Sequence, residues 1–167
     1  MFAQHTLESA PAGSRPLMES TAAHLGHLPP AVAKLAESPE LLGGFLHVSG
    51  LFEATTLDPL AREVVVMTIA TRNGCRTCVA MHTGRLRALD AGAALIKALR
   101  SGEPLDEPRL EGLRQFVLRV LATAGEVQED ELTEFLAAGF TTRNALEVVL
   151  GIGTYTMSTL ANRLVRA

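Results

Sequence analysis

Four side chains in one short stretch of the sequence are of types that exchange protons and electrons. Cys75 and Cys78 are three residues apart, and His82 follows one helical turn after the second. Glu63 precedes the first cysteine by twelve residues. Thiols at this spacing attack electrophiles and close disulfides, whereas imidazole and carboxylate groups move protons. These residue types predict thiol-based redox chemistry assisted by acid–base catalysis.

The helix predicted to begin near Cys75 places both cysteines and His82 on one face. At about 100° per residue the three side chains fall within an arc of about 60°, and Leu86 and Leu89 continue that arc. Because this arc is the apolar stripe of the helix, the thiols and the imidazole are expected to be sheltered from water.

The start of this helix favours the reactive, deprotonated form of a thiol. A helix N-terminus carries partial positive charge, and Arg76 adds a full charge nearby. Cys75 and Cys78 are one turn apart, near enough to close a disulfide with little backbone movement. His82 lies one turn beyond Cys78, within reach for proton transfer directly or through one water.

Glu63 lies on a predicted helix, residues 59–72, that is apolar nearly all round, and a helix of this kind is usually buried. A buried carboxylate must be paired or protonated, and such surroundings suit a general base near neutral pH. The short Asn73-Gly74 turn requires this helix and the next to pack side by side. The crossing angle decides whether Glu63 reaches the thiols, and a surface or interface position for Glu63 stays open.

Other interpretations of these residues also stay open. The four side chains together are able to ligate zinc, although a structural zinc site usually has a second Cys or His pair. The cysteines are otherwise two small buried apolar side chains. The remaining histidines of interest have no visible partner and are assigned no role; the first two are expected in a loop, as solvated side chains. They are His24, His27 and His47.

The composition is that of an ordinary globular chain. Of 167 residues, 47% are apolar and 20% charged, which excludes a disordered chain. Fifteen Lys and Arg against 18 Asp and Glu give a net charge of −3, and there is no Trp and one Tyr. Neither a basic surface nor an aromatic platform for nucleic acid is therefore expected.

Membrane insertion and secretion are not expected either. The longest uncharged apolar run, residues 148–161, is shorter than the ~20 residues that a membrane span needs. The first residues lack the basic and apolar pattern of a secretion signal. We therefore expect a cytoplasmic protein, in which a close cysteine pair is catalytic or metal-binding rather than structural.

The elements that must position these residues are all predicted to be helices. Residues 1–28 show no clear period and are expected to form an N-terminal arm, whereas residues 29–167 form one all-α domain of about eight helices. Gly151 and Gly153 are expected to let the last helix approach a neighbour or another subunit. The predicted helices are residues 30–37, 39 to about 52, 59–72, 75–90, a short helix to 102, one capped by Asp106, 129–138, and a final helix capped by Thr141 or Thr142.

The four residues and their surroundings resemble the AhpD-like alkylhydroperoxidases, which belong to the carboxymuconolactone decarboxylase family. The resemblance is close over roughly residues 41–92, and the final helix, with Asn162 near its end, is a weaker match. It is carried by the fixed spacing of the four residues and by Leu57-Asp58-Pro59, Asn73-Gly74-Cys75 and His82-Thr83.

The resemblance implies a single-domain AhpD-like helical fold that usually assembles into trimers or hexamers. It implies a thiol peroxidase that reduces hydroperoxides. We expect an external dithiol or protein reductant as its partner, and no cofactor or metal. By the family's pattern, Cys78 attacks the peroxide, Cys75 resolves the product, and Glu63 and His82 form a proton relay. The founding member has a histidine at the position of Thr77, and threonine cannot act as a base near neutral pH.

Two other functions are weighed against the peroxidase. A lactone decarboxylase of the same family needs a proton donor and acceptor but no cysteine pair, so the two cysteines argue against it. A redox-sensing or binding oligomer would use the same dithiol without turnover. Steady-state consumption of peroxide with a dithiol reductant separates that oligomer from an enzyme.

Overall fold

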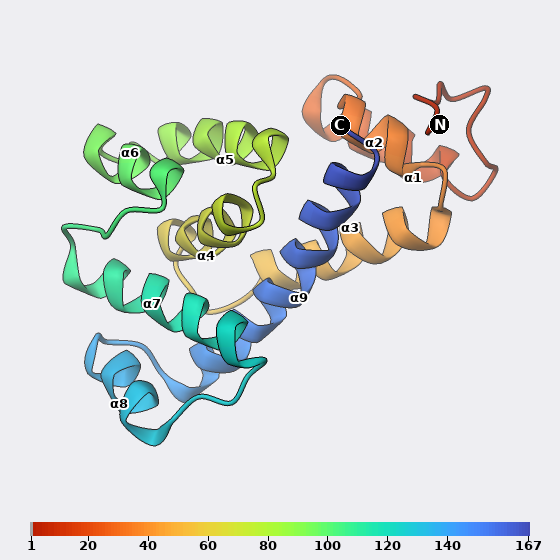
Figure 1. Ribbon diagram of the computed structural model, residues 1–167. Helices are drawn as coiled ribbons and strands as arrows, with labels where there is room; N and C mark the ends of the chain where they lie inside the picture. The colour runs from red at the N-terminus through yellow and green to blue at the C-terminus, as the bar shows by residue number, and fades with distance from the viewer. Residues whose placement is uncertain (1) are drawn as a thin grey trace.

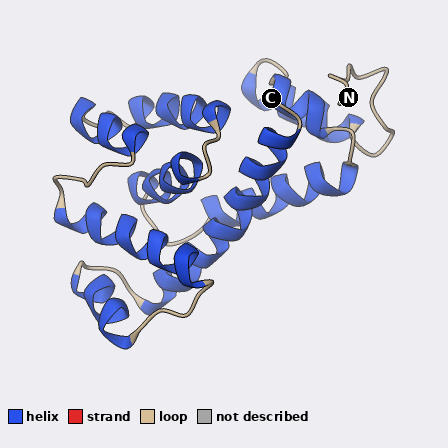
Figure 2. Cartoon of the chain, viewed as in Figure 1, coloured by secondary structure: helices blue, strands red, loops and turns tan. Residues whose placement is uncertain are grey.

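The computed structural model describes residues 2–167 as nine α-helices, with no strand among these residues (Figures 1 and 2). The all-α prediction is confirmed, with one helix more than the eight expected. The helices are α1 (Arg15–Leu25), α2 (Pro30–Leu35), α3 (Pro39–Glu53), α4 (Pro59–Arg72), α5 (Arg76–Ala88), α6 (Ala93–Ser101), α7 (Pro108–Thr123), α8 (Glu129–Ala137) and α9 (Thr142–Leu164).

The additional helix, α1, lies in the segment expected to be an irregular arm. Pro16 stands in its first turn, and Gly26 ends it in the left-handed conformation with φ of 75°. Its one buried side chain, Met18, packs in a small apolar cluster with Leu42 and Val165. A helix that buries a single side chain leaves too weak a period in the sequence to be recognised, yet this one is docked on α3 and the end of α9.

Side-chain caps begin the helices at three of the predicted points, one of them Thr141, whose Oγ1 accepts a hydrogen bond from the Asn144 N–H at the start of α9. Ser38 and Asp58 each accept a hydrogen bond from a backbone N–H in the first turn of α3 and α4. The cap of α7 is Glu107 and not Asp106 as predicted. Pro108 takes the first helical position, so the residue directly before it becomes the cap.

Helix α4 is the centre of the fold, packed against α5, α6, α7 and α9 (Figure 1). Its burial on nearly every side confirms the prediction from its apolar sequence. Glu63 is the one charged side chain among its buried residues, so the core has to satisfy a carboxylate. The buried apolar residues of α4 are Ala61, Val64, Val65, Val66, Met67, Ile69 and Ala70.

Helix α9 runs along both α3 and α4 and touches them closely at Gly151 (Figure 1). A Cβ atom at this position would lie 2.6 Å from Phe52 Cε2 and 3.1 Å from Val65 Cγ1. Glycine is therefore required for this approach, as the sequence predicted. Gly153 faces open space and plays no part in it.

Among residues 2–167 no single helix is long and apolar enough to cross a membrane. Helices α8 and α9 together reach the necessary length and composition, but they are bent by 104° at their junction.

Replacing Gly151 with Ala is expected to lower the free energy of unfolding by about 1–3 kcal/mol, because the added methyl group overlaps the Phe52 ring. The matched control Gly153→Ala, on the same helix with nothing within 4 Å, is expected to raise it by up to about 1 kcal/mol, because alanine is the better helix former. Urea denaturation followed by circular dichroism measures both changes. Equal effects of the two substitutions would contradict the close approach of α9.

Candidate active site

Cys75 and Cys78 form a disulfide at the start of α5, with their Cα atoms 5.4 Å apart. Cys75 is the N-cap of the helix and Cys78 lies in its first turn, where the Cys78 N–H donates to Cys75 Sγ at 3.4 Å. The residues are only 2% and 3% exposed. The expected shelter of the sulfurs is therefore confirmed, and the structure represents the oxidised pair.

The turn between α4 and α5 brings the two helices side by side. Gly74 adopts the left-handed conformation with φ of 66°, which favours glycine, and the Cys75 N–H donates to the carbonyl oxygen of Ala70 at 3.0 Å. The chain thus reverses within two residues, and the disulfide lies against the last buried turn of α4.

Glu63 meets His82 across the contact between these helices. Glu63 Oε2 accepts a hydrogen bond from His82 Nδ1 at 2.7 Å, and the residues are 5% and 2% exposed. The carboxylate holds the ring in the tautomer with hydrogen on Nδ1, so Nε2 is left as an acceptor. Among the described residues no hydrogen bond joins His82 to either sulfur. The helix crossing therefore directs Glu63 to the imidazole and not to the thiols.

A positive charge completes the environment of this pair. Arg85 Nη1 lies 3.5 Å from Glu63 Oε1 and 2.7 Å from Glu53 Oε1. Burial alone would lower the pKa of Arg85, but its hydrogen bond to Glu53 and the charge of Glu63 raise that pKa above its usual value. Arg85 is therefore a fixed cation beside the buried carboxylate.

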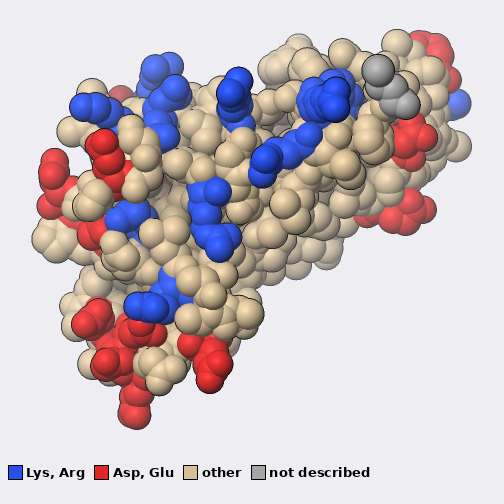
Figure 3. All heavy atoms as spheres, in the orientation of Figure 1, with Lys and Arg blue, Asp and Glu red and all other residues tan. Residues whose placement is uncertain are grey.

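Positive charge also surrounds the helix that carries the thiols. On the face shown in Figure 3, Lys and Arg side chains gather over α5 and α6, whereas Asp and Glu side chains gather over α8. Cationic surroundings at a helix N-terminus favour a thiolate over a thiol.

The buried stripe of α5 matches the prediction at four of five positions. Cys75, Cys78, His82 and Leu86 are buried. Leu89 is 42% exposed, because it follows the last helical residue as the C-cap and does not extend the stripe.

Helix α9 supplies further polar groups that the sequence analysis did not assign to the site. Asn162 Nδ2 donates to Cys78 Sγ at 3.4 Å and lies 3.5 Å from Ser158 Oγ. The Tyr155 ring meets the His82 ring edge-on, with centroids 5.6 Å apart. A signal for this face exists: Thr154, Ser158 and Asn162 recur every four residues along an otherwise apolar helix.

Tyr155 is a neutral group at this place. Burial raises the pKa of its phenol above the ordinary value, and the contact with Ser49 Oγ at 3.4 Å offsets only part of that rise. The hydroxyl therefore stays protonated near neutral pH, and the ring packs against His82 without carrying charge.

The end of α9 also covers the disulfide. Asn73 Nδ2 donates to Thr159 Oγ1 at 2.9 Å, and Arg163 Nη1 donates to the Asn73 carbonyl at 2.6 Å. Thr77 Oγ1 donates to the carbonyl oxygen of Ala167 at 2.6 Å. Thr77 therefore ties the turn between the cysteines to the segment after α9.

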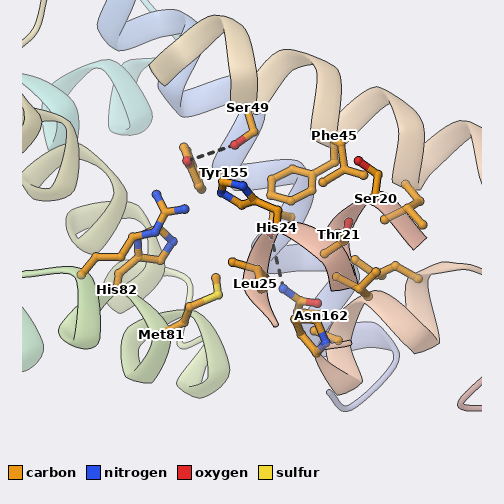
Figure 4. A pocket seen from close by; sticks show the side chains of 18 residues that line it. Ser20, Thr21, His24, Leu25, Phe45, Ser49, Met81, His82, Tyr155 and Asn162 are labelled. Carbon is orange, nitrogen blue, oxygen red and sulfur yellow. Dashed lines mark hydrogen bonds between the residues drawn. The ribbon is translucent and has the colours of Figure 1, made fainter. Parts of the chain in front are cut away.

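A cavity of about 320 Å³ is lined on one side by His82 and Asn162 (Figure 4). Most of its wall is apolar, and helices α1, α2 and α3 form the side opposite α5 and α9. The lining includes Thr21, His24, Leu25, Val32, Leu35, Leu42, Phe45, Leu46, Ser49, Met81, His82, Arg85, Tyr155, Ser158 and Asn162.

The three unassigned histidines lie apart from the buried pair. His24 is exposed and stands in the last turn of α1 on the cavity wall, not in a loop as expected. His27 and His47 are exposed. Within residues 2–167 no three or more His, Cys, Asp and Glu side chains are grouped to hold a metal ion, and the two sulfurs are bonded to each other.

Residues 39–106 match the carboxymuconolactone decarboxylase family, and this segment contains Glu63, both cysteines and His82. Over this segment the chain is similar to that family. The family segment spans α3 to α6, so α1 and α9, which line the cavity, lie outside it. No curated protein gives a significant match.

Two solved structures share the fold over nearly the whole chain. The first, an alkylhydroperoxidase AhpD core described as an uncharacterized peroxidase-related protein from Ralstonia eutropha JMP134, has a TM-score of 0.85 at 20% identity and covers 98% of this chain and 88% of its own. An uncharacterized peroxidase-related protein from Silicibacter sp. TM1040 has a TM-score of 0.80 at 19% identity, with 99% and 89% covered. At these identities the likeness establishes the AhpD-like fold and nothing further.

Replacing Arg163 with Ala is expected to make the disulfide easier to reduce. Loss of its hydrogen bond to the Asn73 carbonyl lowers by about 1 kcal/mol the free energy needed to move the end of α9 away from the disulfide. Reduction of the folded protein by dithiothreitol should therefore be about fivefold faster. Arg166→Ala is the matched control, since it removes an exposed charge from the same segment. Equal rates for the two variants would contradict a cover held by Arg163.

Proposed function

We propose that this protein is a thiol peroxidase that reduces organic hydroperoxides, with Cys75 and Cys78 as its redox pair. The observation that carries the proposal is that the Cys75–Cys78 bond and the Glu63–His82 hydrogen bond share one buried face of α5, beside an apolar cavity. The peroxidase-related descriptions of the two structural neighbours support the same class of reaction.

Cys78 is the better candidate for the attacking thiol. Its sulfur receives the Asn162 N–H, and its position is one turn from His82. The Cys78 thiolate attacks the terminal oxygen of ROOH, an S–O bond forms and the O–O bond breaks. The sulfur is oxidised to a sulfenic acid, and the peroxide is reduced to an alkoxide that takes a proton to become ROH.

The Glu63–His82 pair supplies the proton transfers. His82 Nε2 accepts the Cys78 proton through one water, because no direct hydrogen bond joins the ring to the sulfur. Glu63 stabilises the imidazolium that results, as a carboxylate bonded to Nδ1 does in other acid–base sites. The same proton then passes to the alkoxide.

Cys75 completes the cycle as the resolving thiol. It attacks the sulfur of the Cys78 sulfenic acid, which forms the disulfide and releases water. An external dithiol then reduces the disulfide by thiol exchange and is itself oxidised. The full reaction converts ROOH and a dithiol into ROH, water and a disulfide, with no metal or organic cofactor. Such a cycle suits the reducing cytoplasm, which we propose as its compartment.

The outer face of α9 supports self-association. Leu146, Val149, Leu160 and Leu164 are 73%, 49%, 54% and 69% exposed and fall within an arc of about 60° along the helix. Exposed apolar side chains on one face of a helix are typical of a protein interface. We therefore propose a homo-oligomer, for which the family resemblance implies a trimer or hexamer.

Treatment of the reduced protein with cumene hydroperoxide is expected to oxidise both thiols. When dithiothreitol is present, the protein should go on consuming peroxide. Cys78→Ser is expected to abolish the reaction, whereas Cys75→Ser should react once and stop at the sulfenic acid. Thiol titration and peroxide assays measure these outcomes. If peroxide leaves both wild-type thiols free, the proposal is wrong; a single oxidation without turnover would favour the redox-sensing function.

Replacing Glu63 with Gln is expected to slow oxidation of Cys78 by about 100-fold, because the amide keeps the shape of the side chain but cannot stabilise the imidazolium. Stopped-flow measurement of thiol oxidation gives the rate. The matched control is Glu147→Gln, which removes another buried carboxylate. Glu147 accepts hydrogen bonds from Thr56 and Asn144 near the start of α9, at the opposite end of that helix from Asn162. Both variants should be less stable than the wild type, but only Glu63→Gln should show slower oxidation of Cys78. Equal rates would remove Glu63 from the mechanism.

A further inference from the structure

The carboxamide of Asn162 has a hydrogen-bonded nitrogen and an oxygen without a hydrogen-bond partner among the described residues. Its Nδ2 donates to Cys78 Sγ at 3.4 Å, whereas its Oδ1 is buried and has no hydrogen-bond partner among the described residues. The residue is 6% exposed. A buried acceptor without a partner costs about 1–3 kcal/mol, so an unsatisfied oxygen beside a reactive sulfur calls for a physical explanation.

The surroundings of Asn162 indicate what kind of donor this oxygen is suited to receive. Asn162 and His82 lie at the α5–α9 side of the cavity, and apolar residues such as Leu25, Leu42 and Phe45 line much of the remainder (Figure 4). A volume of about 320 Å³ is at the lower end of the range for small-molecule sites. The site therefore fits a compact apolar molecule with one hydrogen-bond donor at its end.

The phenol, imidazole Nδ1 and guanidinium groups at this end of the cavity already have protein partners. The Tyr155 hydroxyl pairs with Ser49, and His82 Nδ1 is held by Glu63. Arg85 is paired with the carboxylate of Glu53. Asn162 Oδ1 thus remains an acceptor without a protein donor among the described residues, on the side chain whose Nδ2 contacts the sulfur.

We propose that Asn162 binds the hydroperoxide group, with Oδ1 accepting a hydrogen bond from the terminal O–H while Nδ2 holds the Cys78 sulfur. This inference rests on the proposed peroxidase function. An organic hydroperoxide carries its only O–H donor on the oxygen that the thiolate attacks, and its carbon skeleton suits the apolar wall. One rigid carboxamide would therefore align both reacting atoms, which is the source of rate acceleration by positioning.

The reaction is balanced in this arrangement. The Cys78 sulfur forms a bond to the terminal oxygen, the O–O bond breaks, and the electron pair leaves with the RO group, which takes the proton from His82. The hydrogen bonded to Asn162 Oδ1 stays on the transferred oxygen as the sulfenic acid proton. Asn162 itself neither gains nor loses a proton.

The test compares two reagents that attack the same sulfur, in a Cys75→Ser background that leaves Cys78 as the sole thiol. Cumene hydroperoxide has the O–H donor, whereas methyl methanethiosulfonate has neither an O–H nor an N–H donor. The ratio of their rate constants isolates recognition of the peroxide from the reactivity of the sulfur. Asn162→Ala is expected to lower this ratio by about tenfold, since one hydrogen bond is lost to the peroxide alone.

Two further variants keep the test decisive. Asn162→Asp retains the acceptor and loses the N–H donor, so both rates should fall while their ratio stays within about threefold of the parent. Asn162→Leu fills the space with an apolar group and should reproduce the loss of ratio if the alanine variant does not fold. An unchanged ratio in the folded Ala or Leu variant would overturn the role of Asn162. Failure of the parent protein to react with the peroxide, while it still reacts with the thiosulfonate, would instead overturn the proposed function.

Discussion

A carboxylate in the interior of a helical protein is stable only when other groups satisfy it, and Glu63 imposes that condition on this fold. It lies on α4, otherwise the most apolar helix of the chain, and its main partner is His82 on α5. Breaking a buried pair of this kind by removing one partner costs about 3–5 kcal/mol. The packing of α4 on α5 is therefore tied to this hydrogen bond, which also turns the cysteine face of α5 inward.

The position and burial of the cysteine pair depend on three helices and not on the cysteine motif alone. The turn after α4 brings Cys75 to the start of α5, and the end of α9 contacts the Cys78 sulfur and the turn before Cys75. These contacts depend on the close approach of α9 at Gly151, far from the chemistry. Packing of glycine against Phe52 is thus what allows Asn162 to reach Cys78.

The family segment, residues 39–106, contains the four candidate site residues, whereas helices outside it form much of the cavity wall. Residues 39–106 contain Glu63, both cysteines and His82, the groups proposed to exchange protons and electrons, and the cysteines lie at the positive end of the dipole of α5. Helices α1 and α9 lie outside the segment and build much of the cavity wall. A chain with the same motif but other flanking helices would have a differently shaped cavity beside its cysteine pair.

The sequence alone determined the helical class, most helix boundaries and the set of Glu63, Cys75, Cys78 and His82, because these depend on local periodicity, capping residues and fixed spacing within one helix. Three features were decided only by the tertiary structure: the docking of α1, the partner of Glu63 and the contact of Asn162 with Cys78. Each depends on the angle and distance at which separate helices cross. Those quantities come from the packing of whole side-chain surfaces, and no local pattern of residues encodes them.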